Sequence, residues 1–354
     1  MPRYIAFAIS ILAVLAATGI ASAQQAAARR LPASIIDVMP PSQRVTGEMG
    51  KMQARATACR NMPIAETRRR IVNIAVQEWA FFGFPVLNAA DDVDEVAERS
   101  NATAVPGRRG GRFAPLPLNE ITRVASSVAG YWAVTPLGPS MIANQNREWN
   151  GPEGINGRWA DPWSAAFISW VMCEAGLGNT SQFQRSIAHW NYIDQAIAAR
   201  DGRAPNAAYV AYNLGEENIL PGDMLCSGRR PAYTNLAERR RQTGVGARTH
   251  CDIVVQIDEK NARILTVGGN VRRAVSVKLF PAAKDARGNW RPVNPADSSR
   301  TRSLFAHLKL RAEAIEFDAL KNSPTIGTLG CQQKVSEPRS ALNLFPAVLA
   351  GGSC

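Results

Sequence analysis

Apolar residues recur at helical spacing through the first half of the chain. Over 66–82 and over 119–133 they return every three or four positions, which predicts two amphipathic helices. A further helix is predicted over 186–199. Between these last two lies a segment that breaks at Pro162 and begins a helix at or near Ser164. This helix is apolar on most of its surface, so we expect it to be buried.

The second half of the chain has the short apolar runs, bounded by turn residues, that are typical of strands. Strands are predicted from 224 onward and over 250–257, 264–267, 273–279 and 303–310. Segments 135–157 and 229–247 are predicted to be loops, and 312–321 to be helical. Helices followed by antiparallel strands are typical of an α+β fold, in which the helices pack on an antiparallel sheet.

The N-terminus has the pattern of a signal peptide. Arg3 is followed by an apolar stretch over 5–20 and by the small residues Ala21, Ser22 and Ala23, so we expect cleavage before Gln24. This places the protein in the periplasm or outside the cell. No later stretch is long and apolar enough to cross a bilayer.

Three further regions follow from the patterning. Residues 24–58 have weak periodicity and are predicted to form an extended lead-in. Residues 59–311 are expected to form one domain, with a Gly-, Arg- and Pro-rich surface insertion at 88–117. Residues 312–354 are expected to form a C-terminal tail. Nothing in the sequence indicates the oligomeric state.

The chain is basic, with 41 Lys and Arg residues against 29 Asp and Glu residues and a net charge of +12. This charge suits an anionic environment such as the cell envelope, and the export signal argues against a nucleic-acid partner. The six cysteines are an even number in an exported chain, which predicts disulfides. Because no C-x-x-C or H-x-x-x-H pair is present, no metal or cofactor is implied. Cys173 lies nine residues after Ser164, on the opposite side of the same helix, and is expected to be core or disulfide-bonded.

Four segments resemble the CHAP and NlpC-type papain-like cysteine amidases. Residues 162–170 (PWSAAFISW) look like their nucleophile helix, and 220–224 (LPGDM) resemble their Pro-Gly-Asp turn. Residues 249–255 (THCDIVV) resemble the strand with the catalytic His, and 267–271 (VGGNV) resemble the segment that orients this His. The order and spacing agree over roughly residues 65–310, so the resemblance implies a papain-like fold.

The resemblance also implies a set of site residues, with one departure. Ser164 stands where these amidases have Cys, a form found in an exported bacterial family of unknown function of which this chain is identified as a member. His250 would be the base, and Asn270 would orient it. Asp252 is the alternative, because residues two apart on a strand share a face.

Serine changes the chemistry that this site would need. A Cys thiol has a pKa of about 8.5 and is readily held as a thiolate, whereas a serine hydroxyl is far less acidic. Ser164 would therefore need a general base and an oxyanion hole. The local pattern also fits Ser164 as a simple helix N-cap.

Other residues are placed around the site by the same resemblance. Trp149, Trp159 and Trp163 would flank the cleft entrance, where they stack on sugar or peptide or else pack the helix. His189 is expected to be a cleft-wall or packing residue, and His307 to be structural. In this fold the strands carrying Cys226 and Cys251 are neighbours, which predicts a disulfide. Cys331 and Cys354 would then form a disulfide within the tail, leaving Cys59 to pair with Cys173.

Three functions remain open on these observations. The first is a peptidoglycan amide hydrolase that uses Ser164, His250 and either Asn270 or Asp252. The second is a non-catalytic cleft that binds cell-wall peptide or a protein partner. The third is an exported structural domain of an envelope assembly.

Overall fold

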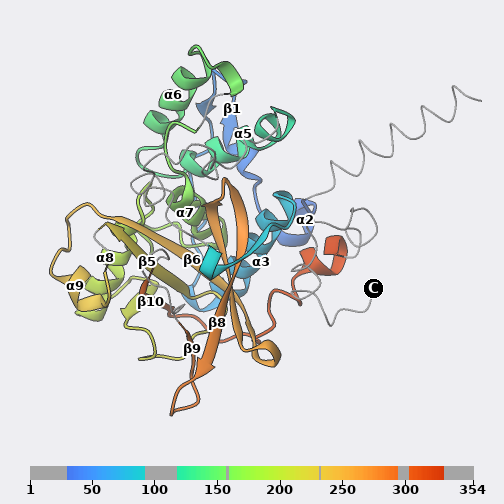
Figure 1. Ribbon diagram of the computed structural model, residues 1–354. Coiled ribbons are helices and arrows are strands. Elements are labelled where there is room, and N and C mark those ends of the chain that lie inside the picture. Colours follow the sequence, from blue (N-terminus) through green and yellow to red (C-terminus); the bar gives the residue numbers. More distant parts are fainter. Residues whose placement is uncertain (1–29, 92–117, 157–158, 231–232, 294–302, 331–354) are drawn as a thin grey trace, which may run out of the picture.

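The computed structural model describes residues 30–91, 118–156, 159–230, 233–293 and 303–330. The predicted signal peptide and most of the predicted insertion lie outside these residues, as do Cys331 and Cys354. Helices and a long sheet are packed together, so the α+β class predicted from the sequence is confirmed (Figure 1). No helix within the described ranges has the length and apolar character needed to cross a membrane.

The sheet is built mostly from the second half of the chain. Its strands run in the order β3-β8-β7-β6-β5-β10-β4, with β9 beside β8, and all pairs are antiparallel except β3 with β8. The strands are β3 (Val86–Asn88), β4 (Tyr209–Tyr212), β5 (Met224–Arg230), β6 (Arg248–Asp258), β7 (Arg263–Val271), β8 (Ala274–Lys284), β9 (Trp290–Pro292) and β10 (Leu304–Leu310). The strands predicted from the sequence are all present.

The described helices are α2 (Ala33–Ile36), α3 (Thr67–Phe81), α5 (Leu118–Ala133), α6 (Gly138–Trp149), α7 (Ser164–Ala175), α8 (His189–Arg200) and α9 (Leu236–Arg240). Three of them, α3, α7 and α8, pack directly on the large sheet. Helices α3 and α7 contact β6 and β7, α5 contacts α7, and α8 contacts β4 and β6. Every residue of α7 after Ser164 is buried, as its apolar surface predicts.

Three local predictions are corrected by the structure. The predicted loop 135–157 contains α6, whose Ile142 and Trp149 are buried against the rest of the domain, and the loop 229–247 contains α9. The segment 312–321 forms turns instead of a helix. Its backbone instead binds β6. The carbonyl oxygen of Phe317 accepts from the N–H of Ile257, and the N–H of Leu320 donates to the carbonyl oxygen of Val255. These bonds to the sheet replace the bonds within the segment that a helix requires.

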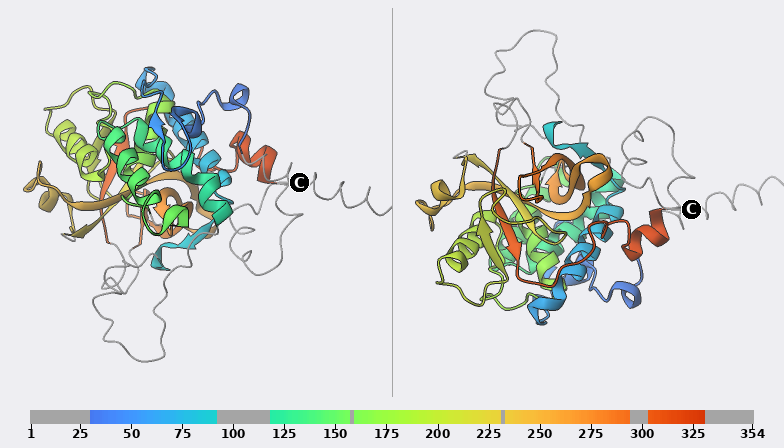
Figure 2. Two further views of the ribbon diagram at one scale, coloured as in Figure 1. Left: turned by 90° about the horizontal axis from the view of Figure 1, so that it is seen from above. Right: turned by 90° about the horizontal axis from the view of Figure 1, so that it is seen from below.

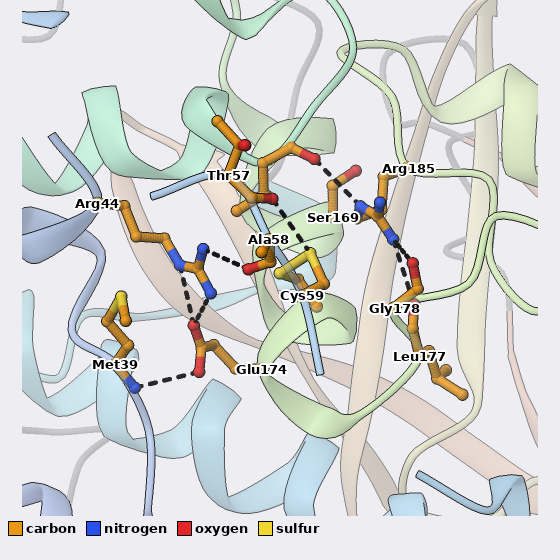
Figure 3. The surroundings of a disulfide bond; sticks show 12 residues. Met39, Arg44, Thr57, Ala58, Cys59, Ser169, Glu174, Leu177, Gly178 and Arg185 are labelled. Atoms are coloured by element: carbon orange, nitrogen blue, oxygen red, sulfur yellow. Dashed lines mark hydrogen bonds and ion pairs between the residues drawn. A yellow bond between two sulfur atoms is a disulfide. The ribbon is translucent and has the colours of Figure 1, made fainter. Parts of the chain in front are cut away.

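The predicted lead-in 24–58 is also corrected, because its described part is packed on the domain. It forms α2 and a small pair of strands, β1 (Val45–Thr46) and β2 (Gln53–Ala54). Arg44 binds the buried carboxylate of Glu174 on α7 and the carbonyl oxygen of Ala58 (Figure 3). A disulfide then joins Cys59 to Cys173, which lies next to Glu174 (Figure 3).

The last described segment, a π-helical turn at Ile326–Gly330, also returns to this side of the molecule. In both views of Figure 2 it lies near α2, and its Leu329 is buried in the same core. Ion pairs, a disulfide and single apolar anchors have no sequence period. The hydrophobic period of the sequence therefore does not predict these contacts.

Candidate functional site

Helix α7 begins at Ser164, but this serine is not a cap. Trp163 holds the N-cap position without any side-chain cap bond. Its indole is fully buried and stacks between Phe82 and Tyr131, at ring distances of 5.7 and 5.8 Å. The half-buried Ser164 instead places its Oγ 2.8 Å from Nε2 of His189.

His189 is the first residue of α8 and is buried between α7 and the sheet. Its Nδ1 accepts a hydrogen bond from the backbone N–H of Cys251 at 3.2 Å and contacts the hydroxyl of Tyr192. The first residue of β6 that pairs with β7 is Ile253. The backbone N–H of Cys251, two residues earlier, is therefore not used by β7 and can bind His189.

These contacts decide where the proton of His189 lies. A backbone N–H can only donate, so Nδ1 must present its lone pair to Cys251. The neutral ring then carries its hydrogen on Nε2 and donates it to Ser164 Oγ. Burial, followed by the charges of His250, Arg229 and Lys278, lowers the pKa of His189 well below its ordinary value, which keeps the ring neutral.

His250 belongs to a second polar group beside the first. Its Nε2 lies 2.9 Å from Oδ1 of Asp252, whose Oδ2 lies 2.6 Å from Nζ of Lys278 on β8. All three side chains are buried. Burial raises the pKa of Asp252, but the charges of Lys278 and His250 outweigh it and hold the pKa below its ordinary value. The carboxylate is therefore ionised.

A glycine on β7 makes room for this carboxylate. A Cβ added at Gly268 would lie 1.8 Å from Oδ1 of Asp252, so any other residue would push Asp252 away from His250. The two histidine rings lie 4.9 Å apart between centroids, which brings both groups into one cluster.

The structure thus changes the partner of Ser164. The sequence interpretation assigned His250 to it, whereas the histidine in contact with its hydroxyl is His189. Asp252 shares a strand face with His250, as expected, and binds it. Asn270 lies in a β7 irregularity with φ at 55°, and within the described residues no hydrogen bond joins it to either histidine.

His189 was missed as a partner because it lies on a helix 25 residues after Ser164, outside every motif that carries the resemblance. The available signal was weak. His189 and Tyr192 are three residues apart at the start of a predicted helix, a spacing that puts them on the same face.

The three tryptophans do not form an exposed cleft wall. Trp163 and Trp149 are buried, and the half-buried Trp159 packs against Trp132 and Trp149. Large flat side chains beside a buried helix gain more from packing than from exposure, which favours the packing alternative. His307 has the contacts of a structural residue, because its Nε2 lies 2.9 Å from a carboxylate oxygen of the buried Asp223.

The expected disulfide between Cys226 and Cys251 is present and joins β5 to β6 next to His250. The remaining pair, Cys59 with Cys173, is present as well. Among the described residues, no group of three or more His, Cys, Asp or Glu side chains is placed to hold a metal ion.

A family model matches residues 125–309, just over half of the chain and all of the site described above. The chain belongs to this family, uncharacterized proteins conserved in bacteria (DUF2272). The DUF2272 region begins within α5, so α3 and the disulfide partner Cys59 lie outside it. Searches of curated proteins and of solved structures each returned no match.

Proposed function

We propose that this protein is an exported, non-catalytic relative of the papain-like amidases whose cleft binds cell-wall peptide. One observation carries the proposal: the backbone N–H of Cys251 points at Nδ1 of His189, while Nε2 faces Ser164 Oγ. This arrangement is the reverse of the one that activates a serine nucleophile.

A serine nucleophile needs the lone pair of the facing imidazole nitrogen, with the other nitrogen donating to an acceptor that stabilises the imidazolium. At His189 the far nitrogen meets a donor instead. Protonating this ring would set Nδ1–H against the N–H of Cys251, and a backbone amide in a strand cannot rotate away. The lowered pKa of His189 acts in the same direction, because it opposes uptake of the serine proton.

The same geometry suits binding. Ser164 accepts from His189, so its own hydrogen is available to a ligand oxygen. It also stands at the first turn of α7, where backbone N–H groups have no partner within the helix and the helix dipole favours negative charge. A peptide carbonyl or carboxylate is the natural ligand for such a position.

The cell-envelope location is proposed from three features. The N-terminal pattern is that of a signal peptide, and the net charge of +12 suits an anionic envelope. Two disulfides are compatible with an oxidising compartment. The papain-like relationship is supported by the placement of the four motifs on α7, on the turn before β5, and on β6 and β7.

A second candidate function is hydrolysis, and the pair of His250 with Asp252 favours it. An imidazole whose Nε2 is held 2.9 Å from an ionised carboxylate is the usual form of a general base. Its Nδ1 has no hydrogen-bond partner within the described part of the chain. In this case the Ser164 hydroxyl would turn from His189 to His250 before attacking an amide of peptidoglycan.

Purified muropeptides separate the two candidates. Mature protein and its Ser164→Ala and Ser164→Cys variants are incubated with them. Cleavage is followed by mass spectrometry and binding by calorimetry. Ser181→Ala, at an exposed position, serves as the matched control.

We expect the wild type to bind without cleaving and Ser164→Ala to bind more weakly than the control. Cleavage that appears only in Ser164→Cys would also support a site that lacks only its nucleophile. Cleavage by the wild type that is lost in Ser164→Ala would establish the hydrolase instead. If the wild type neither binds nor cleaves, both functions are refuted.

A further inference from the structure

Arg229 is a half-buried arginine without an acidic partner in the described structure. Four buried or half-buried arginines are paired with carboxylates: Arg30 with Glu78, Arg44 with Glu174, Arg68 with Asp223 and Arg239 with Asp194. Two others, Arg70 and Arg185, donate to backbone carbonyl oxygens instead. Within the described ranges the side chain of Arg229 has no ion pair or hydrogen bond, and its Nε is shielded from solvent. A shielded N–H without an acceptor is costly unless a ligand supplies one.

The position of Arg229 in the sheet puts it beside the candidate site. On the paired strands β5 and β6, Ser227 faces His250 and Gly228 faces Thr249. The register then shifts, so that Arg230 faces Arg248 and Arg229 is the extra residue of a β-bulge. Bulges next to functional sites commonly redirect a side chain. On the facing strand, Thr249 also has a buried hydroxyl without a partner in the described part of the chain.

The charges around Arg229 are mainly positive. Lys278 and Arg229 both act on His189, and the carboxylate of Asp252 is already shared by His250 and Lys278. The cluster therefore has a cation in excess, and the missing partner of Arg229 is an anion.

We infer that Arg229 binds a carboxylate of the peptide that Ser164 contacts, and this inference rests on the proposed function. A guanidinium matches a carboxylate with two parallel hydrogen bonds, and such charge-assisted bonds are stronger than neutral ones. Arg229 would thereby select peptides that carry a free carboxylate over their amidated forms.

Two synthetic stem peptides test this inference, one with a C-terminal carboxylate and one with a C-terminal amide. Their affinities are measured by calorimetry for the wild type, for Arg229→Gln and for Arg229→Lys. Arg248→Gln is the matched control, because it removes the same charge from an exposed position on the facing strand. Thermal melting checks that each variant is folded.

We expect the wild type to bind the acid at least about tenfold more tightly than the amide. Arg229→Gln should abolish this preference, Arg229→Lys should retain part of it, and Arg248→Gln should leave it unchanged. Equal affinities of the wild type for both peptides would overturn the role of Arg229 while leaving the proposed function in place. Failure of the wild type to bind either peptide would overturn both.

Discussion

Asp223 holds together the part of the sheet from which the candidate site is built, so its replacement by Asn should strongly destabilise the protein. The side chain is fully buried. One oxygen accepts from Arg68 on α3 at 2.8 Å, and the other accepts from His307 on β10 at 2.9 Å. The backbone N–H groups of Leu220 and Leu310 donate to the same carboxylate.

The magnitude follows from the guanidinium that would lose its partner. Arg68 is 1% exposed, so Asp223→Asn leaves a buried cation without its counter-charge. Breaking a buried ion pair in this way costs about 3–5 kcal/mol. At about 2–4 °C per kcal/mol for a large domain, the melting temperature should fall by roughly 6–20 °C.

The assay is thermal and urea unfolding at pH 7, with Asp201→Asn as the control. Asp201 also pairs with two arginines, Arg203 and Arg240, but at the surface, where a pair contributes about 1 kcal/mol or less. A loss in Asp223→Asn no larger than that in the control would refute the argument that this carboxylate anchors the sheet.

Acid provides a second test of the same residue. Burial raises the pKa of Asp223, but the hydrogen bond from His307 and the charges of Arg68 and Lys309 outweigh it, so the pKa lies well below its ordinary value. A carboxylate with a depressed pKa stabilises the fold above its unfolded pKa of about 3.9, and this stabilisation is lost as the pH falls further. The free energies of unfolding of the wild type and Asp223→Asn should therefore differ by the full amount at pH 7 and become equal in strong acid.

Three further predictions concern the site and the disulfides. Because the pKa of His189 is lowered by folding, the unfolded chain binds a proton that the folded chain does not. The free energy of unfolding should thus decrease as the pH falls below about 6.5, by up to about 1.4 kcal/mol per pH unit, and His189→Gln should lack this contribution in urea titrations. Nitrogen-15 NMR of the three histidines should show His189 as the Nε2–H tautomer at pH 7, and a proton on Nδ1 would contradict the assignment made from Cys251. Replacing Cys59 and Cys173 together by Ser should cost about 5 kcal/mol, against about 3.5 kcal/mol for Cys226 and Cys251, because the loops closed span 114 and 25 residues. Urea unfolding without reductant measures both, and equal losses would argue against the loop-entropy account.

The spacing of apolar residues predicted the helices and strands whose formation depends on neighbouring residues in the sequence. Helix α7 was predictable because its residues are apolar around most of the helix, and β6 because its centre, residues 253–255, is a short run of β-branched residues. The shared face of His250 and Asp252 follows from the two-residue period of a strand alone. The resemblance to the papain-like amidases predicted the disulfide between Cys226 and Cys251, because it predicted that the two strands carrying them are adjacent.

Tertiary structure alone decided which histidine meets Ser164 and which proton that histidine carries. The contact of Ser164 with His189 depends on how α8 docks against α7, and the tautomer depends on a backbone N–H of β6. Neither has a sequence signature, because backbone groups are the same at every position and docking is set by the whole core. Sequence alone therefore determined that Ser164 stands at the start of a buried helix, and packing determined that its hydroxyl meets His189.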